Sequence, residues 1–156
     1  MYDQELVVTR ILDAPRELVW KAWADPERFM RWWGPKDFTA PFCKSDFRIG
    51  GTYLNCMRSP GGQDSWRRGL YLDIVEPERI ICTYSFADAA GNVLKPTDCG
   101  LSPDLPLVFQ VTVTLEELEG KTTMTMRQVG IPPCELDERW EQGWNQAFDK
   151  LAESLK

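Results

Sequence analysis

The C-terminal stretch of the chain, from Glu135 to Leu155, places an apolar side chain at every third or fourth position. The apolar stripe comprises Leu136, Trp140, Trp144, Ala147, Leu151 and Leu155, with Phe148 beside them. The intervening positions are mostly acidic or amide residues, so the pattern predicts a long amphipathic helix. Such a helix must bury its stripe against a second layer, and the rest of the chain has to provide that apolar surface.

The second layer is predicted to be an antiparallel sheet. Alternation of apolar and polar residues is clearest from Leu107 to Glu116, and it recurs around Met124 and Met126. One face of such a strand is buried and the other faces solvent. Further strands, rich in β-branched and aromatic residues, are predicted at 6–12, 38–47, 51–58, 65–76 and 79–86.

Two short helices are predicted between the first and second strands. Pro15 suits the first position of a helix, where its missing N–H is harmless, and Asp25 suits the N-cap of a second helix. That second helix would end at Gly34 and would carry Phe29, Met30, Trp32 and Trp33. The core is expected to hold the tryptophans at helical spacing, namely Trp20, Trp23 and Trp32.

The predicted fold class is α+β: a curved antiparallel sheet wrapped around a long C-terminal helix, with two short helices after strand 1. A length of 156 residues suits one domain, so residues 1–156 are expected to form a single unit. The segment from Ala87 to Pro106 is rich in glycine and proline and is too long for a tight hairpin. It is predicted to be a functional loop, a lid or an insertion.

Composition narrows the partners and the compartment. Lys and Arg total 18 against 24 Asp and Glu, a net charge of −6, which argues against a nucleic-acid partner. No run of 18 apolar residues could form a membrane span, and the charged N-terminus is unlike a signal peptide, so a cytoplasmic location is expected. The five cysteines are odd in number and lack a CxxC motif, which favours reduced thiols over disulfides or a zinc site.

The sequence offers little for catalysis. The chain has no histidine, which removes the commonest general base and the Ser–His and Cys–His nucleophile pairs. It also lacks a GxSxG motif and a glycine-rich phosphate loop. A buried Asp or Glu could still act as a base, but no pair of carboxylates stands out. We therefore name no catalytic residue, no metal ligand and no cofactor.

Aromatic residues are the main candidates for ligand binding. Apolar pockets are commonly walled by flat rings and oriented by a few polar groups. The candidate site comprises Tyr53, Tyr71, Tyr84, Phe109, Trp140, Trp144, Phe148 and Arg48. Other polar groups that could face the cavity are Arg68, Asp73 and Arg127, and strand register decides which of them point inward. Gly143, in mid-helix, is expected to allow close approach of another segment such as a strand.

Arg48 has two interpretations. Asp46 and Arg48 lie two residues apart beside the glycine pair Gly50-Gly51. The favoured interpretation is an ion pair at a bend, where the glycines adopt positive φ or form a bulge. The alternative is that Arg48 anchors a ligand carboxylate or phosphate.

Four segments resemble a known family when taken together. They are RILDAPRELVWKAWADPERFMRWWGP, DFRIGGTY, GLYLDIVEPERIICTYSF and EQGWNQAFDKLAESL. In this order they resemble the activator of heat-shock-protein-90 ATPase homologue family, part of the START-like helix-grip (SRPBCC) superfamily. The resemblance implies a sheet gripping the C-terminal helix with a cavity between them. It covers only the C-terminal domain of the two-domain eukaryotic namesake, and the 87–106 segment looks extended relative to shorter members.

Three functions follow as expectations. The first is binding of a small hydrophobic or amphipathic ligand in the cavity. The second, implied by the family name and its stress-response role, is a chaperone cofactor or regulatory protein-interaction module. The third, and least favoured, is a cyclase-like or hydrolase-like enzyme in the same cavity. The chain is expected to be a monomer or a homodimer, with an exposed Trp33 or the long loop as a possible dimer contact.

Overall fold

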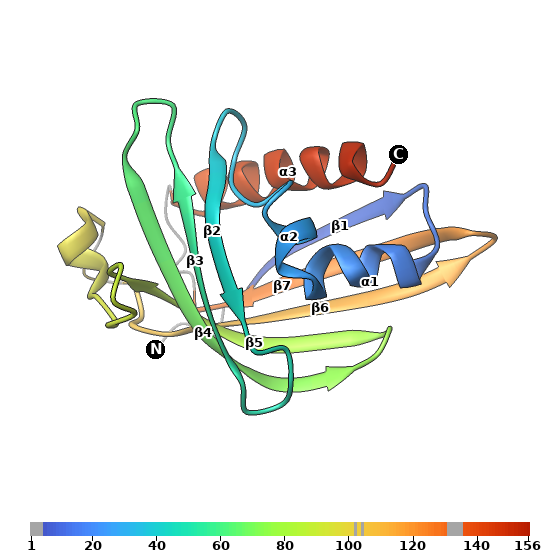
Figure 1. Cartoon of the computed structure of the whole chain (residues 1–156), viewed down its shortest axis with the longest axis horizontal. Helices are drawn as coiled ribbons and strands as arrows, with labels where there is room; N and C mark the ends of the chain where they lie inside the picture. Colours follow the sequence, from blue (N-terminus) through green and yellow to red (C-terminus); the bar gives the residue numbers. More distant parts are fainter. Residues whose placement is uncertain (1–4, 102, 104, 131–135) are drawn as a thin grey trace.

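The computed structural model describes residues 5–101, 103, 105–130 and 136–156, with side chains undescribed at 136–139. A seven-stranded sheet has the order β1-β7-β6-β5-β4-β3-β2, and every neighbouring pair is antiparallel. The strands are β1 (Glu5–Leu12), β2 (Thr39–Ser45), β3 (Thr52–Arg58), β4 (Asp64–Val75), β5 (Arg79–Ala87), β6 (Phe109–Leu118) and β7 (Lys121–Val129). The helices are α1 (Arg16–Ala24), α2 (Pro26–Phe29), a short 3₁₀ helix (Pro96–Cys99) and α3 (Leu136–Ser154). The predicted fold class and element order are confirmed (Figure 1).

The alternating sequence pattern predicts the buried face of the sheet correctly. In β6 the side chains of Phe109, Val111, Val113 and Leu115 are buried, and in β7 Met124 and Met126 are buried. Val113 lies opposite Met126 in the register, so the two strands present one continuous apolar surface. The C-terminal helix packs on this surface, as the amphipathic pattern requires.

The helix starts agree with the sequence, but the second helix is shorter than predicted. α1 begins at Arg16 with Pro15 as its N-cap, one residue later than predicted. Asp25 caps α2 as predicted, since its Oδ1 accepts the Glu27 N–H at 3.1 Å. Regular helix stops at Phe29, because the amides of Arg31 and Trp32 bond three residues back, to Arg28 O at 3.1 Å and to Phe29 O at 3.3 Å.

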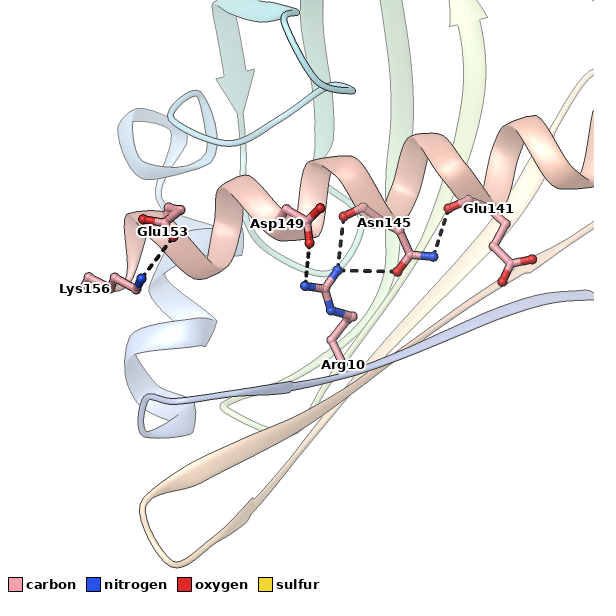
Figure 2. Close-up of polar contacts among 6 residues, drawn as sticks. All are labelled: Arg10, Glu141, Asn145, Asp149, Glu153 and Lys156. Carbon is pink, nitrogen blue, oxygen red and sulfur yellow. Dashed lines mark hydrogen bonds and ion pairs between the residues drawn. The ribbon is translucent and has the colours of Figure 1, made fainter.

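Hydrogen bonds from two polar side chains hold α3 to the rest of the domain. Arg10 of β1 donates to the Asn145 carbonyl at 3.1 Å and to Asp149 Oδ1 at 2.7 Å (Figure 2). On α3 as well, Lys150 Nζ donates to the carbonyls of Pro35 and Phe38 at 3.1 and 3.0 Å. The helix is therefore held to the edge strand β1 and to the loop that follows α2.

The tryptophans behave as core residues, with one correction. Trp20 and Trp32 are buried, and Trp23 is partly buried against the core, as predicted. Trp33 is only 6% exposed, so the expectation of an exposed Trp33 at a dimer contact is wrong. Its ring is stacked on Phe29, with centroids 4.8 Å apart, and meets Trp144 edge-on at 5.3 Å.

The long segment after β5 folds back on the sheet. Val93 forms a bridge with Ala87, and the Leu94 N–H donates to the Phe86 carbonyl at 2.8 Å. Leu105 is buried in the core. The segment therefore contacts the domain at a few points, and most of its other described residues are exposed.

Candidate functional site

Two neighbouring cavities lie inside the layer between α3 and the sheet. An inner cavity of about 50 Å³ is lined mainly by β2, β3, β4 and β5, together with residues of the α1–α2 region. An outer cavity of about 250 Å³ opens beside α3 and includes Leu101 of the long segment after β5. Both walls are predominantly apolar and aromatic, which is the usual make-up of small-molecule sites.

Three aromatic side chains line both cavities and separate them: Trp33, Tyr84 and Trp144. Trp144 meets Trp33 edge-on at 5.3 Å and lies 6.4 Å from Tyr84 between centroids. We call these residues the aromatic partition.

Arg67 of β4 brings a positive charge to the outer cavity. Its guanidinium carbon lies 4.4 Å from the Phe86 ring centroid, which places the cation over an aromatic face. Its Nε donates to the Tyr84 hydroxyl at 2.7 Å. One Nη donates to Ser65 Oγ and, at 3.1 Å, to the Trp66 carbonyl. These contacts fix the guanidinium within the cavity wall.

The inner cavity is lined by weakly polar groups. Tyr53 donates its hydroxyl to the Thr83 carbonyl at 2.6 Å, and the Tyr71 hydroxyl is 2.8 Å from Ser45 Oγ. Burial raises the pKa of both phenols. Burial also raises the pKa of the thiols of Cys43 and Cys82, to about 11 and about 12. All four groups therefore stay protonated and neutral near pH 7.

Two buried polar atoms on the cavity walls have no partner among the described residues. They are the indole Nε1 of Trp33 and the side-chain oxygen of Asn55. Asn55 is 1% exposed, and it lies directly opposite Arg67 in the β3–β4 register. Both atoms have almost no accessible surface, so neither reaches a molecule in the cavities without rearrangement, and each unpaired atom costs about 1–3 kcal/mol.

The structure gathers most of the predicted site residues, at different depths. Tyr53 and Tyr71 line the inner cavity, Trp140 lines the outer one, and Tyr84 and Trp144 line both. Phe109 and Phe148 are fully buried and support the lining rings. Phe109 lies 5.3 Å from Trp140, and Phe148 lies 5.6 Å from Trp144.

Arg48 lies apart from both cavities. Its side chain is 70% exposed, and its Nε donates to Asp46 Oδ2 at 2.8 Å. Gly50 has φ +85°, and a Cβ on Gly51 would lie 2.0 Å from the Asp46 carbonyl oxygen. The ion pair at a glycine bend is therefore confirmed, and the structure does not bring Arg48 to the ligand site.

Sequence reasoning missed Arg67 and favoured its neighbour. Arg68 points elsewhere: it donates to the Gly91 carbonyl at 2.8 Å and lines a separate polar hollow of about 290 Å³. Asp73 and Arg127 also lie outside the cavities, paired with Arg79 and Glu5. The sequence did contain a signal for Arg67. Arg67 and Arg68 are adjacent on a strand, and alternation places one of two adjacent side chains on the inward face.

Gly143 allows the helix to approach a loop rather than a strand. A Cβ built there would lie 3.7 Å from Pro35 Cγ, an ordinary contact distance. Gly143 also lines the outer cavity. The expected close approach to a strand is therefore wrong, and the missing side chain instead leaves room in the cavity.

The ionisable groups on the described cavity walls are thiols, phenols and the Arg67 guanidinium. Protonated thiols and phenols are poor bases and poor nucleophiles near neutral pH. Within the described residues there is no cluster of three or more acidic, cysteine or histidine side chains placed to hold a metal ion. No helix in the same part of the chain has the length and apolar character needed to cross a membrane.

A curved antiparallel sheet closed over a C-terminal helix, with an aromatic cavity between them, defines a START-like helix-grip domain. The chain belongs to the family described as Activator of Hsp90 ATPase homolog 1-like protein, whose model matches residues 13–156. No curated protein matches the chain.

Solved structures agree with this assignment. A crystal structure of a protein from Chromobacterium violaceum is 31% identical, with a TM-score of 0.78, covering 97% of this chain and 96% of that one. A solution structure of a protein from Arthrobacter aurescens is 26% identical, with a TM-score of 0.81, covering 98% and 86%. The AHSA1 protein from Silicibacter pomeroyi is 19% identical, with a TM-score of 0.77 and 97% coverage of both chains, and shares the fold.

Proposed function

We propose that this domain binds a small hydrophobic or amphipathic molecule in the outer cavity, between α3 and the sheet. The observation that carries the proposal is the aromatic chamber of about 250 Å³, bordered by Trp33, Trp140 and Trp144. A cavity of about 150 Å³ already accepts a benzene-sized molecule, so a ring-sized guest has room here. Apolar burial would supply most of the affinity.

Phenylbutanol is a suitable first probe, because it combines a ring, a short apolar chain and one neutral polar group. Saturating ligand at 100 times Kd stabilises the folded state by about 2.7 kcal/mol. For a chain of this length, that corresponds to a rise in Tm of about 5–10 °C. The tryptophans at the cavity should also change their fluorescence on binding.

A matched pair of variants localises the response. Gly143→Leu adds a side chain into the outer cavity and should abolish both the shift in Tm and the fluorescence change. Gln142→Leu adds the same side chain one residue earlier, at an exposed position on α3, and should respond like the wild type. An unresponsive wild type, or a folded Gly143→Leu that responds normally, would count against the proposal.

The family description favours a second candidate, a chaperone-associated interaction module using the exposed side of α3. Charge reversal of Glu141, which is exposed and has no ion-pair partner within the described residues, should weaken such an interaction in a salt-dependent manner. Asp149 is already paired with Arg10, and Glu153 with Lys156, as Figure 2 shows. A pull-down with purified Hsp90 that retains no complex would remove this candidate.

A further inference from the structure

Arg67 has unused hydrogen-bonding capacity inside the outer cavity. A guanidinium carries five N–H donors. Nε donates to Tyr84, and one Nη donates to Ser65 and to the Trp66 carbonyl. The second Nη has no hydrogen-bond partner, and no carboxylate lies within ion-pair distance of Arg67, among the described residues. The cation is thus anchored through Nε and one Nη, and the two N–H groups of the second Nη are left to donate to a ligand.

Other donors on the same wall are also unused. Tyr84 accepts from Arg67, and within the described residues nothing accepts its hydroxyl proton. The buried indole N–H of Trp33 has no acceptor within the described residues either, but its nitrogen has almost no accessible surface and does not face the cavity. Tyr84 and Trp33 both line the outer cavity together with Arg67. A wall that presents a cation and a neutral hydroxyl donor, and no acidic side chain among its described residues, is suited to an acceptor-rich, negatively charged group.

The geometry points to an amphipathic carboxylate as the ligand class: its carboxylate accepts from the second Nη of Arg67, and its apolar body lies along Trp140, Trp144 and Phe86. This inference rests on the ligand-binding function proposed above and specifies its ligand. Arg67 is the selective element, since a hydrogen bond between its charged second Nη and a carboxylate is stronger than one to a neutral group. Tyr84 adds a neutral donor.

The overall charge of the chain does not prevent this pairing. A net charge of −6 repels anions at long range, but screening limits that repulsion to about 8 Å at physiological ionic strength. Inside the cavity the nearest formal charge is that of Arg67, held over the Phe86 ring among apolar side chains. Short-range pairing there is screened less than on the open surface.

Three probes with the same body separate charge from shape: phenylbutyrate, phenylbutanol and phenylbutylamine, titrated calorimetrically near pH 7. The wild type should bind the acid about tenfold more tightly than the alcohol, and the amine more weakly than the alcohol. This order needs no variant, so it tests the inference even if substitutions at Arg67 impair folding. Equal affinity for acid and alcohol, or tighter binding of the amine, overturns it.

Arg67→Gln should remove the preference for the acid, so that the acid and the alcohol bind this variant with affinities within about threefold of each other. Arg68→Gln is the matched control, since it removes a neighbouring charge that lines the other hollow, and should keep the preference. A folded Arg67→Gln that still prefers the acid overturns the inference. If neither acid nor alcohol binds the wild type, the proposed function itself fails, whereas alcohol binding without acid preference refutes only the role of Arg67.

Discussion

A buried hydrogen bond between α3 and β7 gives the sharpest test of how the helix is held. The Trp144 indole N–H donates to the side-chain oxygen of Gln128 at 2.8 Å. Trp144 is 7% exposed and Gln128 is 0% exposed. The amide nitrogen of Gln128 has no partner among the described residues, so this bond is the one described polar contact of its side chain. Trp144→Phe removes the donor and leaves the whole amide unpaired.

The expected cost follows from two contributions. Replacing indole by phenyl loses about 1 kcal/mol of apolar burial, at roughly 25 cal/mol per Å². Stranding the buried amide adds about 1–3 kcal/mol. Trp144→Phe should therefore lower the free energy of unfolding by about 2–4 kcal/mol. Trp144→Ala should cost about 3–5 kcal/mol, because the lost volume then dominates.

The double variant Trp144→Phe with Gln128→Met tests the polar contribution. Replacing both partners of a buried hydrogen bond by apolar groups can be nearly neutral, so the double variant should be more stable than Trp144→Phe alone. The coupling energy should be about 1–2 kcal/mol. Urea unfolding followed by far-ultraviolet circular dichroism measures it without relying on the altered tryptophan.

An exposed glutamine supplies the control for that cycle. Gln110 of β6 faces solvent, and Gln110→Met should show no coupling to Trp144→Phe. If Gln128→Met is also additive with Trp144→Phe within about 0.5 kcal/mol, the amide is not stranded by loss of the indole. The account of how α3 is held would then be refuted.

Three further perturbations have defined outcomes. Gly143→Ala should raise the free energy of unfolding by about 0.5–1 kcal/mol, since helix propensity improves without a clash, and a lower Tm would contradict this. Iodoacetamide near pH 8 should label the exposed Cys99 before the partly buried Cys82, whose pKa is raised to about 12, and peptide mapping that finds Cys82 labelled first would contradict this. Hydrogen bonds from Asn92 and nearby amides lower the pKa of Asp88, so its stabilising contribution is present above its unfolded pKa and is lost as pH falls through the lower folded value. Asp88→Asn should therefore flatten the decline in Tm between about pH 4 and pH 2, and an unchanged decline would contradict the assignment.

The elements were predictable because their residues follow simple periods. Every second residue of β6 from Phe109 to Leu115 is buried, and α3 buries Trp144, Ala147, Phe148 and Leu151 at helical spacing. Local signals also predicted where helical segments begin and end. Asp25 caps the start of α2, and Gly34, whose φ is +100°, ends the turn that follows α2. These features depend only on residues that lie close together in the sequence, so a single sequence is enough to predict them.

The polar lining of the cavity was not predictable, because it depends on strand register. The β4–β5 pairing shifts between Tyr71 and Asp73, which interrupts simple alternation within β4. Arg67 and Tyr71 lie before the shift and line the cavities, whereas Asp73 lies after it and pairs with Arg79 at the partly exposed surface. Nothing local in the sequence marks the bulge, so the outward position of Asp73 required coordinates.

The division of the interior into two cavities also constrains the size of the ligand. A single hollow lined by rings was expected, but Trp33, Tyr84 and Trp144 fill its middle and leave about 50 Å³ on the inner side. That inner volume suits water beside Asn55 rather than an organic molecule. A guest that extends inward has to move the aromatic partition, and the lost ring contacts reduce its affinity. Among carboxylates with the same headgroup, affinity should therefore stop rising with chain length once the outer cavity is full, unlike in a continuous tunnel.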